Sequence, residues 1–152
     1  YFIYGPVPFS AATEEYVSAV ESNNRTNRIF AEDSNPLVTR RGDKPAFPGE
    51  ELVIIPSPFF PNKLIKGYSN HAGWVVKSVN DVPVRNLRHL VELLRDCRDR
   101  YVRIDFWGEY TSMLIFERAQ IQGATDDVLN DNGIRSQGSP DMMAVWNARS
   151  AP

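Results

Sequence analysis

Residues 73–106, GWVVKSVNDVPVRNLRHLVELLRDCRDRYVRIDF, decide the fold of this chain because their hydrophobic period changes twice. Trp74 and the valines after it are aromatic and β-branched residues, which favour strands. Asn80-Asp81 is a turn dipeptide, since both side chains bond the nearby backbone and both tolerate left-handed dihedral angles. Pro83 restricts the residue before it to an extended conformation. The stretch therefore begins as a strand that ends in a tight turn.

The middle of the stretch has the period of an amphipathic helix over residues 86–97. Four apolar residues lie at i, i+3, i+4 and i+7, which is one face of a helix: Leu87, Leu90, Val91 and Leu94. Charged residues occupy the opposite face. Residues 101–106 then alternate between polar and apolar, the period of a half-buried strand. The whole stretch predicts one strand, turn, helix and strand unit.

Size and composition are those of one globular domain. The chain has 152 residues, of which 42% are hydrophobic and 24% charged, and this length suffices for one core. A formal net charge of −2 provides no overall field that favours nucleic acid or an anionic membrane. No apolar run reaches the roughly 20 residues of a membrane span. The single cysteine, Cys97, excludes an internal disulfide, and nothing names a cellular compartment.

The part of the chain before this unit predicts short elements. Residues 1–10 contain prolines and predict either an edge strand or a strand broken by a loop, and Thr13 is a candidate N-cap for a short helix. Residues 21–50 are rich in Asn, Arg, Asp, Gly and Pro and predict an exposed connection, with one short element around residues 36–38. Residues 51–55 predict a strand.

The part of the chain after this unit predicts a return strand, a helix and a tail. A hairpin connection at residues 107–110 leads to a strand over residues 111–116. Residues 123–132 predict a short helix, and Gly133 suits the position that follows its C-cap. From residue 135 onward the chain is mostly polar, with a few apolar residues able to dock.

No set of residues predicts an active site. The two histidines, His71 and His89, are far apart in the sequence, and no glycine-flanked serine of a nucleophile elbow occurs. One cysteine and two separated histidines do not form the ligand cluster of a metal site. Glycine-rich nucleotide-binding loops are absent as well. We therefore expect no catalytic residues, no metal and no cofactor.

The order of the blocks resembles the C-terminal PDZ-like domain of Deg (HtrA-type) serine proteases almost from end to end. A strand, a V-N-x-x-x-V turn, a helix of L-x-x-L type and a strand is how PDZ domains close. The blocks that carry the resemblance are YFIYG and VPF (1–9), VVKSVN (75–80) and VRNLRHLV (84–91), and the GI…S…S…DM tail (133–142). Departures are Pro6 in place of a second glycine, Arg135 in place of a proline, and an inserted Pro140.

This resemblance implies an α+β fold, a PDZ-like, partly open antiparallel β-barrel or sandwich flanked by helices, with a C-terminal helical extension. Residues 1–134 would form the PDZ-like domain, with 21–50 as an exposed loop or insertion, and residues 135–152 a tail. In that fold a partner peptide adds to a strand edge beside the helix. The residues expected to bind the peptide are Gly5, Val7, Phe9, His89, Leu90 and Leu93. Pro6 and Pro8 remove two N–H donors from this region.

The same resemblance implies a non-catalytic role. In the family the catalytic triad belongs to a separate trypsin-like domain, and PDZ domains serve oligomer assembly or the docking of substrates and peptides. Expected partners are protein or peptide segments and neighbouring PDZ or protease domains, in a parent that is a homo-oligomer. Apolar contacts with partners are expected from some of Phe59, Phe60, Met142, Met143 and Trp146. Two alternatives are a free-standing peptide-binding adaptor with no protease domain and an enzyme in its own right.

Overall fold

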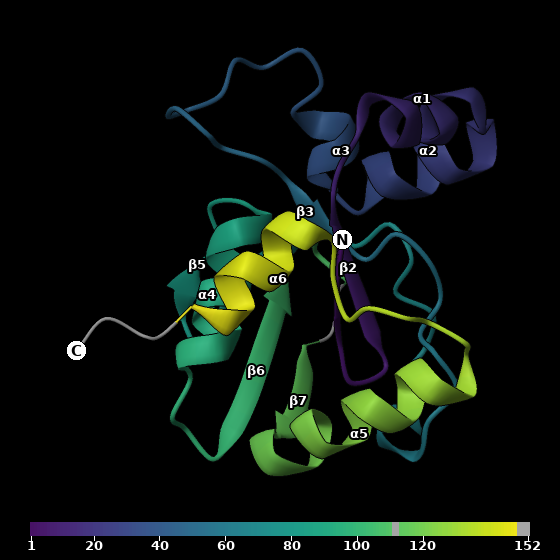
Figure 1. The fold of residues 1–152 in the computed structure, drawn as a ribbon. Coiled ribbons are helices and arrows are strands. Elements are labelled where there is room, and N and C mark those ends of the chain that lie inside the picture. Colours follow the sequence, from purple (N-terminus) through teal and green to yellow (C-terminus); the bar gives the residue numbers. More distant parts are fainter. Residues whose placement is uncertain (111–112, 149–152) are drawn as a thin grey trace.

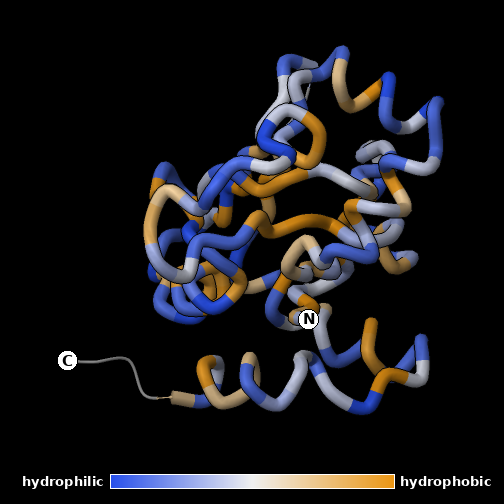
Figure 2. The backbone as a smooth tube through the Cα atoms, turned by 90° about the horizontal axis from the view of Figure 1, so that it is seen from above, coloured by the Kyte–Doolittle hydropathy of each residue, from blue (hydrophilic) through white to orange (hydrophobic). Residues whose placement is uncertain are grey.

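The computed structural model describes residues 1–110 and 113–148, and within these ranges the chain folds into two antiparallel sheets and six α-helices (Figure 1). The sheets are not closed into a barrel. This α+β architecture confirms the predicted PDZ-like fold class. Figure 2 shows that hydrophobic strand segments run through the middle of the domain, where the largest cluster of buried side chains lies.

Three short strands form the first sheet, in the spatial order β1-β2-β3: β1 (Phe2–Tyr4), β2 (Val7–Ala11) and β3 (Val53–Ile54). The two-residue turn Gly5-Pro6 joins β1 to β2, with Phe2 opposite Phe9. Because β2 is the middle strand, β1 and β3 pair with its two edges. Strands are thus formed where the sequence predicted them near residues 1–10 and 51–55.

The second sheet contains the predicted unit and has the strand order β5-β4-β6-β7: β4 (Val76–Val79), β5 (Val82–Pro83), β6 (Tyr101–Phe106) and β7 (Leu114–Glu117). The Asn80-Asp81 turn has positive φ at both residues, which these two residue types tolerate well. An isolated bridge between Ile54 and Val75 links the two sheets. Part of the predicted return strand, residues 111–112, lies outside the described residues.

Helix α4 (Leu87–Asp96) confirms the predicted amphipathic helix. The side-chain oxygen of Asn86 caps it by accepting a hydrogen bond from the His89 backbone N–H at 2.8 Å. The four residues of the predicted apolar face are all buried, and Leu90 and Leu94 are 0% exposed. This face packs against β2 and β4, so the helix closes the core from one side.

The segment 21–50 contains more structure than the sequence predicted. Helix α1 (Glu14–Ser22) follows its expected N-cap Thr13, and α3 (Pro36–Thr39) matches the expected short element. Helix α2 (Asn24–Glu32) was not predicted. Its sequence contains only Ile29 and Phe30 as large apolar residues, too few for a readable period. Phe30 nevertheless packs into a second buried cluster beneath α1 and α3, which stabilises the helix through tertiary contact.

The C-terminal part contains the helical extension that the resemblance implied, although the residue pattern alone predicted less helix. Helix α5 (Arg118–Asp131) begins before the expected start at Gly123, and residues of the expected tail form α6 (Pro140–Asn147). A single turn of 3₁₀ helix, η1 (Lys63–Ile65), follows β3 and precedes β4 in the sequence. The polar composition of residues 135–141 hid α6, whose apolar residues begin only at Met142. The predicted domain boundary after residue 134 stays a prediction.

His71 is a buried polar residue inside the core. Its side chain is 0% exposed and lies among the rings of Phe59, Trp74 and Phe106. Its Nδ1 lies 2.5 Å from the carbonyl oxygen of Ser69, so Nδ1 carries the proton and donates. Nε2 has no hydrogen-bond partner among the described residues. Burial therefore lowers the pKa of His71, because a charged imidazolium would be desolvated there.

Replacing Leu90 with alanine should lower the free energy of unfolding by about 2–5 kcal/mol, because it empties a fully buried leucine site. Chemical denaturation measures this loss. Ile29→Ala on α2, where the side chain is 49% exposed, is the matched control and should change stability by less than about 0.5 kcal/mol. A loss at Leu90 well below about 1 kcal/mol would contradict the packing of α4 described above.

Stability should also depend on pH through His71. The pKa of His71 is lower in the folded chain than its ordinary value of 6.5, so the unfolded chain binds more protons as the solution becomes acidic. The stabilisation is complete above about pH 6.5 and is lost as pH falls through the folded pKa. Denaturation curves should therefore show stability falling as the pH drops below about 6.5, by at most about 1.4 kcal/mol per pH unit.

The variant His71→Asn tests the source of this dependence, because an asparagine amide can still donate to the Ser69 carbonyl but does not titrate. It should flatten the pH profile in this window. His89→Asn is the control, since His89 is only partly buried and should contribute less of the slope. If His89→Asn removes the slope and His71→Asn leaves it, burial of His71 is not its cause.

Candidate peptide-binding groove and the pocket beside helix α4

The six residues expected to bind a peptide fall in three different places. Val7, Phe9 and Leu90 are brought together, but all three are 0% exposed and belong to one hydrophobic cluster. Gly5 lies in the turn between β1 and β2. His89 and Leu93 lie on another side of α4, in the lining of a pocket. The structure therefore does not bring all six into one continuous surface.

Both edges of β2 are occupied by strands of the chain itself. Along one edge β1 pairs with it, with Tyr4 opposite Val7 and Phe2 opposite Phe9. Along the other edge β3 pairs with its last two residues. A peptide that adds to a strand needs free N–H and C=O groups at an edge. Pairing of a partner along Val7–Phe9 on the side of β1 would thus require β1 to move, and peptide binding by the six residues stays a prediction.

The outer edge of β1 is covered as well, by residues 137–139. The Ile3 N–H donates to the Gln137 carbonyl oxygen at 2.8 Å, and the Gln137 side-chain amide donates to the Ile3 carbonyl oxygen at 2.9 Å. The Ser139 N–H donates to the Tyr1 carbonyl oxygen at 3.0 Å. An isolated bridge joins Phe2 and Gly138. The C-terminal segment therefore extends the first sheet by a short antiparallel contact.

Helix α6 continues from this contact and packs against α4 (Figure 1). Met142 and Val145 are buried, and the Trp146 ring lies 5.1 Å from that of Phe2 and 6.1 Å from that of Tyr4. These three residues lie at i, i+3 and i+4, the spacing that marks one helix face. That spacing was the signal in the sequence, obscured by the polar residues before it.

Arg95 joins the two helices at the C-terminal end of α6. Its guanidinium donates to the Val145 carbonyl oxygen at 2.7 Å and also pairs with the carboxylate of Asp96 at 2.6 Å. A cation is favourable at this end of a helix, because the last carbonyl groups carry partial negative charge and lack partners within the helix. The side chain is largely covered, so this contact fixes α6 on α4.

Gly5 is held by helix α5 and not by an open loop. Its φ is +55°, and its N–H donates to the Thr125 hydroxyl oxygen at 2.9 Å in a buried contact. A Cβ added to Gly5 would lie 2.4 Å from Ile121 Cγ1. Glycine is therefore required here both by the backbone conformation and by the close packing of the turn on α5.

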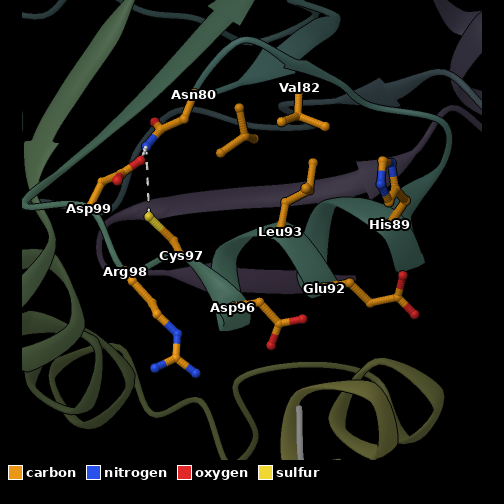
Figure 3. A pocket seen from close by; sticks show the side chains of 10 residues that line it. Asn80, Val82, His89, Glu92, Leu93, Asp96, Cys97, Arg98 and Asp99 are labelled. Atoms are coloured by element: carbon orange, nitrogen blue, oxygen red, sulfur yellow. Dashed lines mark hydrogen bonds between the residues drawn. The ribbon is translucent and has the colours of Figure 1, made fainter. Parts of the chain in front are cut away.

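His89 and Leu93 line a pocket of about 410 Å³ between α4 and the β4–β5 turn (Figure 3). Four residues give it apolar surface: Val79, Val82, Leu93 and Cys97. Polar and charged groups complete the lining: Asn80, His89, Glu92, Asp96, Arg98 and Asp99. In Figure 3 Leu93 and Val82 face each other across the opening, while the carboxylates of Glu92 and Asp96 lie along the margin.

Asn80 fixes the wall of this pocket. Its side-chain amide donates to the Asp99 carboxylate at 2.7 Å and to the Tyr101 carbonyl oxygen at 3.0 Å. Its side-chain oxygen accepts from the Arg103 N–H at 2.6 Å. One residue thus ties the β4–β5 turn to the chain that leaves α4. The pocket is consequently bounded by hydrogen-bonded backbone on one side and by a packed helix on the other.

His89 is neutral near pH 7 in this setting. Burial lowers the pKa of His89 first, and the nearby charge of Arg85 lowers it further, although Glu92 acts in the opposite direction. The Arg85 N–H donates to Nδ1 of the ring at 3.3 Å, which requires Nδ1 to be unprotonated. His89 therefore offers the pocket a weakly polar ring and no positive charge.

The pocket is a cleft lined by apolar and polar groups, an arrangement suited to binding. Within residues 1–110 and 113–148, no three His, Cys, Asp or Glu side chains are placed to hold a metal ion. None of the helices in those ranges is both long enough and apolar enough for a bilayer crossing. What the pocket can do chemically is accept an apolar side chain next to carboxylates.

Replacing Gly5 with alanine should lower the free energy of unfolding by about 2–4 kcal/mol, from positive φ and from the clash with Ile121 together. Gly42→Ala is the matched control, because Gly42 also has positive φ, at +76°, but nothing lies within 4 Å of an added Cβ. It should cost about 1–2 kcal/mol from the backbone alone. Equal losses at both positions in chemical denaturation would refute the packing of the turn on α5.

Comparison with known proteins agrees with this fold. A family model described as a PDZ domain matches residues 1–141. The chain is 34% identical to Protease Do-like 2, chloroplastic, of Arabidopsis thaliana over 66% of its own length, and 36% identical to Putative protease Do-like 12, mitochondrial, of the same organism over 57%. It is also 28% identical to Putative protease Do-like 3, mitochondrial, of Arabidopsis thaliana over 93% of its own length.

These relatives are much longer than the region they share with this chain. The matched region covers 16%, 17% and 22% of the three proteins respectively, so the similarity concerns one part of each of them. The family match, in contrast, runs over nearly the whole chain. With its two antiparallel sheets and the amphipathic helix that closes them, the chain belongs to the PDZ domain family.

Proposed function

We propose that this chain is the non-catalytic protein-interaction domain of a Do-like (Deg/HtrA-type) serine protease, where it serves the assembly of subunits and the docking of protein segments. Its relatives are named as proteases, yet the shared region is about a fifth or less of each of them. The described residues offer a pocket suited to binding. Both observations support a role that accompanies catalysis performed elsewhere in the parent protein.

One observation favours assembly over the capture of free peptides along β2. One edge of β2, the last two residues of its other edge and the outer edge of β1 are already paired with the chain's own backbone. Strand addition at these places would cost the native hydrogen bonds that it replaces. Contacts through side chains on the surface need no such exchange. They suit a neighbouring domain of the same protein, which is present at high effective concentration.

The full-length parent tests this function in two measurements. Removing residues 1–148 of this domain should lower the oligomer mass in multi-angle light scattering and slow the degradation of a protein substrate. Cleavage of a short chromogenic peptide should be affected much less, since the catalytic groups would remain. A parent whose catalytic serine is replaced by alanine is the control and should keep its oligomer mass while losing both activities.

Two results would contradict the proposal. The first is measurable hydrolysis of peptides by the isolated chain, confirmed by loss of the activity after denaturation. The second is a parent without this domain that retains both its oligomer mass and its rate of protein degradation. The isolated chain should instead show no turnover of casein above the buffer level.

A further inference from the structure

The outer edge of the second sheet is closed by one side chain. Strand β7 is the last in the order β5-β4-β6-β7, so one row of its backbone groups faces away from β6. The Tyr68 hydroxyl meets that row at Ile115. It accepts a hydrogen bond from the Ile115 N–H and donates one to the Ile115 carbonyl oxygen, each at 3.1 Å. A single hydroxyl thus occupies the place that a neighbouring strand would take.

The ring of Tyr68 is placed by His71, three residues further along the same segment. The centroids of these two rings lie 6.3 Å apart in an edge-on contact, and the Tyr68 ring also lies 5.7 Å from that of Phe116 in β7. His71 is 0% exposed, and its ring lies 3.8 Å from that of Trp74. The buried imidazole therefore holds residues 67–72 against the core, and the ring of Tyr68 with them.

The two ends of this segment are fixed differently. At its C-terminal end the Gly73 N–H donates to the Ile55 carbonyl oxygen at 2.8 Å, and the Gly73 carbonyl oxygen accepts from the Asn35 side chain at 3.0 Å. Before Gly73 the backbone N–H groups of Tyr68 and Ala72 bond locally, to acceptors within residues 65–70. None of residues 67–72 belongs to a strand, so the segment can move without breaking a strand pair.

The ring of His71 fits its place only while it is neutral. Its Nδ1 donates to the Ser69 carbonyl oxygen, so the single proton of the neutral ring is already there. A second proton would bind to Nε2, which is buried and has no hydrogen-bond partner in the part of the chain that the structure describes. Protonation would thus place a charge and an unsatisfied donor among aromatic rings, and each of these costs free energy.

We propose that residues 67–72 form an acid-sensitive latch on the edge of β7, in which protonation of His71 draws the segment out of the core and releases Tyr68 from Ile115. The latch is closed at neutral pH. When it opens, the outward N–H and C=O groups of Ile115 lose their partner and become accessible. This inference goes beyond the interaction role proposed above and does not depend on it.

The groups around the ring do not offset the cost of a charge. Its neighbours are aromatic: Phe59, Tyr68, Trp74 and Phe106. Of these only Tyr68 titrates, and its hydroxyl is engaged with Ile115. The charged residues of the adjoining elements are exposed or paired elsewhere: Lys63 and Lys66 at η1 are exposed, Lys77 of β4 lies over Trp107, Asp105 of β6 pairs with Arg103, and Glu117 of β7 pairs with Arg100. Burial accordingly lowers the pKa of His71, while its hydrogen bond to Ser69 acts in the opposite direction.

Amide hydrogen exchange in the unmodified chain tests the latch. NMR measures the protection factors of Ile115 and Phe116, and the intrinsic exchange rates correct both for pH. The Ile115 N–H should lose protection by at most about tenfold per pH unit as the pH falls below about 6.5, and the loss should level off once His71 is protonated in the folded chain. The Phe116 N–H is the internal control and should keep its protection, because Phe116 lies opposite Val102 in the β6–β7 ladder.

Three variants assign the loss to the two side chains. His71→Asn keeps a donor for the Ser69 carbonyl oxygen but does not titrate, so it should make the protection of Ile115 independent of pH in this range. Tyr68→Phe removes the hydroxyl and should lower the protection of Ile115 about two- to tenfold already at neutral pH, without affecting Phe116. Tyr101→Phe, at a tyrosine of β6 that is 49% exposed, is the matched control and should leave Ile115 unchanged.

Three results would overturn the latch. The first is protection of Ile115 that stays constant while the NMR signals of the His71 ring show that it takes up a proton. The second is loss of protection at Ile115 and Phe116 together, which marks unfolding of the sheet and not a local opening. The third is a loss in His71→Asn as large as in the unmodified chain, which would assign the pH dependence to another group, such as His89 beside Arg85 and Glu92.

Discussion

The burial of one face of helix α4 is the contact on which the rest of this structure depends. Leu90 and Leu94 are completely buried against strands of both sheets, and together they contribute several kcal/mol of the marginal stability of such a domain. With this face committed to the core, two flanks of the helix remain. One is covered by α6 through Arg95 and Trp146, and the other borders the pocket beside the β4–β5 turn.

Backbone hydrogen bonding within the chain occupies the β1 side of β2 and the outer edge of β1 in this PDZ domain. An unpaired row of N–H and C=O groups is a hazard at any sheet edge, because another chain can pair with it. Here β1 and residues 137–139 satisfy those groups from within the chain. Pro6 and Pro8 lack the N–H donors that a bound peptide would use. The backbone N–H of Gly5 is also occupied, because it donates a hydrogen bond to the hydroxyl oxygen of Thr125 in α5.

The sequence predicted the central unit well and its surroundings less well, for a physical reason. Residues 73–106 have strong periods, capped by Asn86, so strand, turn and helix all form where expected. Helix α2 depends on tertiary contacts of Phe30, which no local pattern reports, and in α6 the i, i+3 and i+4 spacing of Met142, Val145 and Trp146 is obscured by the polar residues before it. The residues of the candidate site were harder to predict than the helices. Leu90 and Leu93 are both apolar positions of α4, and only the packing of the neighbouring elements decides that the first is core and the second lines a pocket.

The occupied edges and the open pocket have the same origin in the geometry of α4. A helix with four buried apolar residues in ten has a narrow apolar face, so side chains just beside that face are only partly covered. On the flank toward β1 the chain supplies its own cover, α6. On the flank toward β5 the hairpin is too short to extend over Leu93, because β5 has two residues and ends at Pro83. The apolar surface beside the hairpin is thus a consequence of strand length.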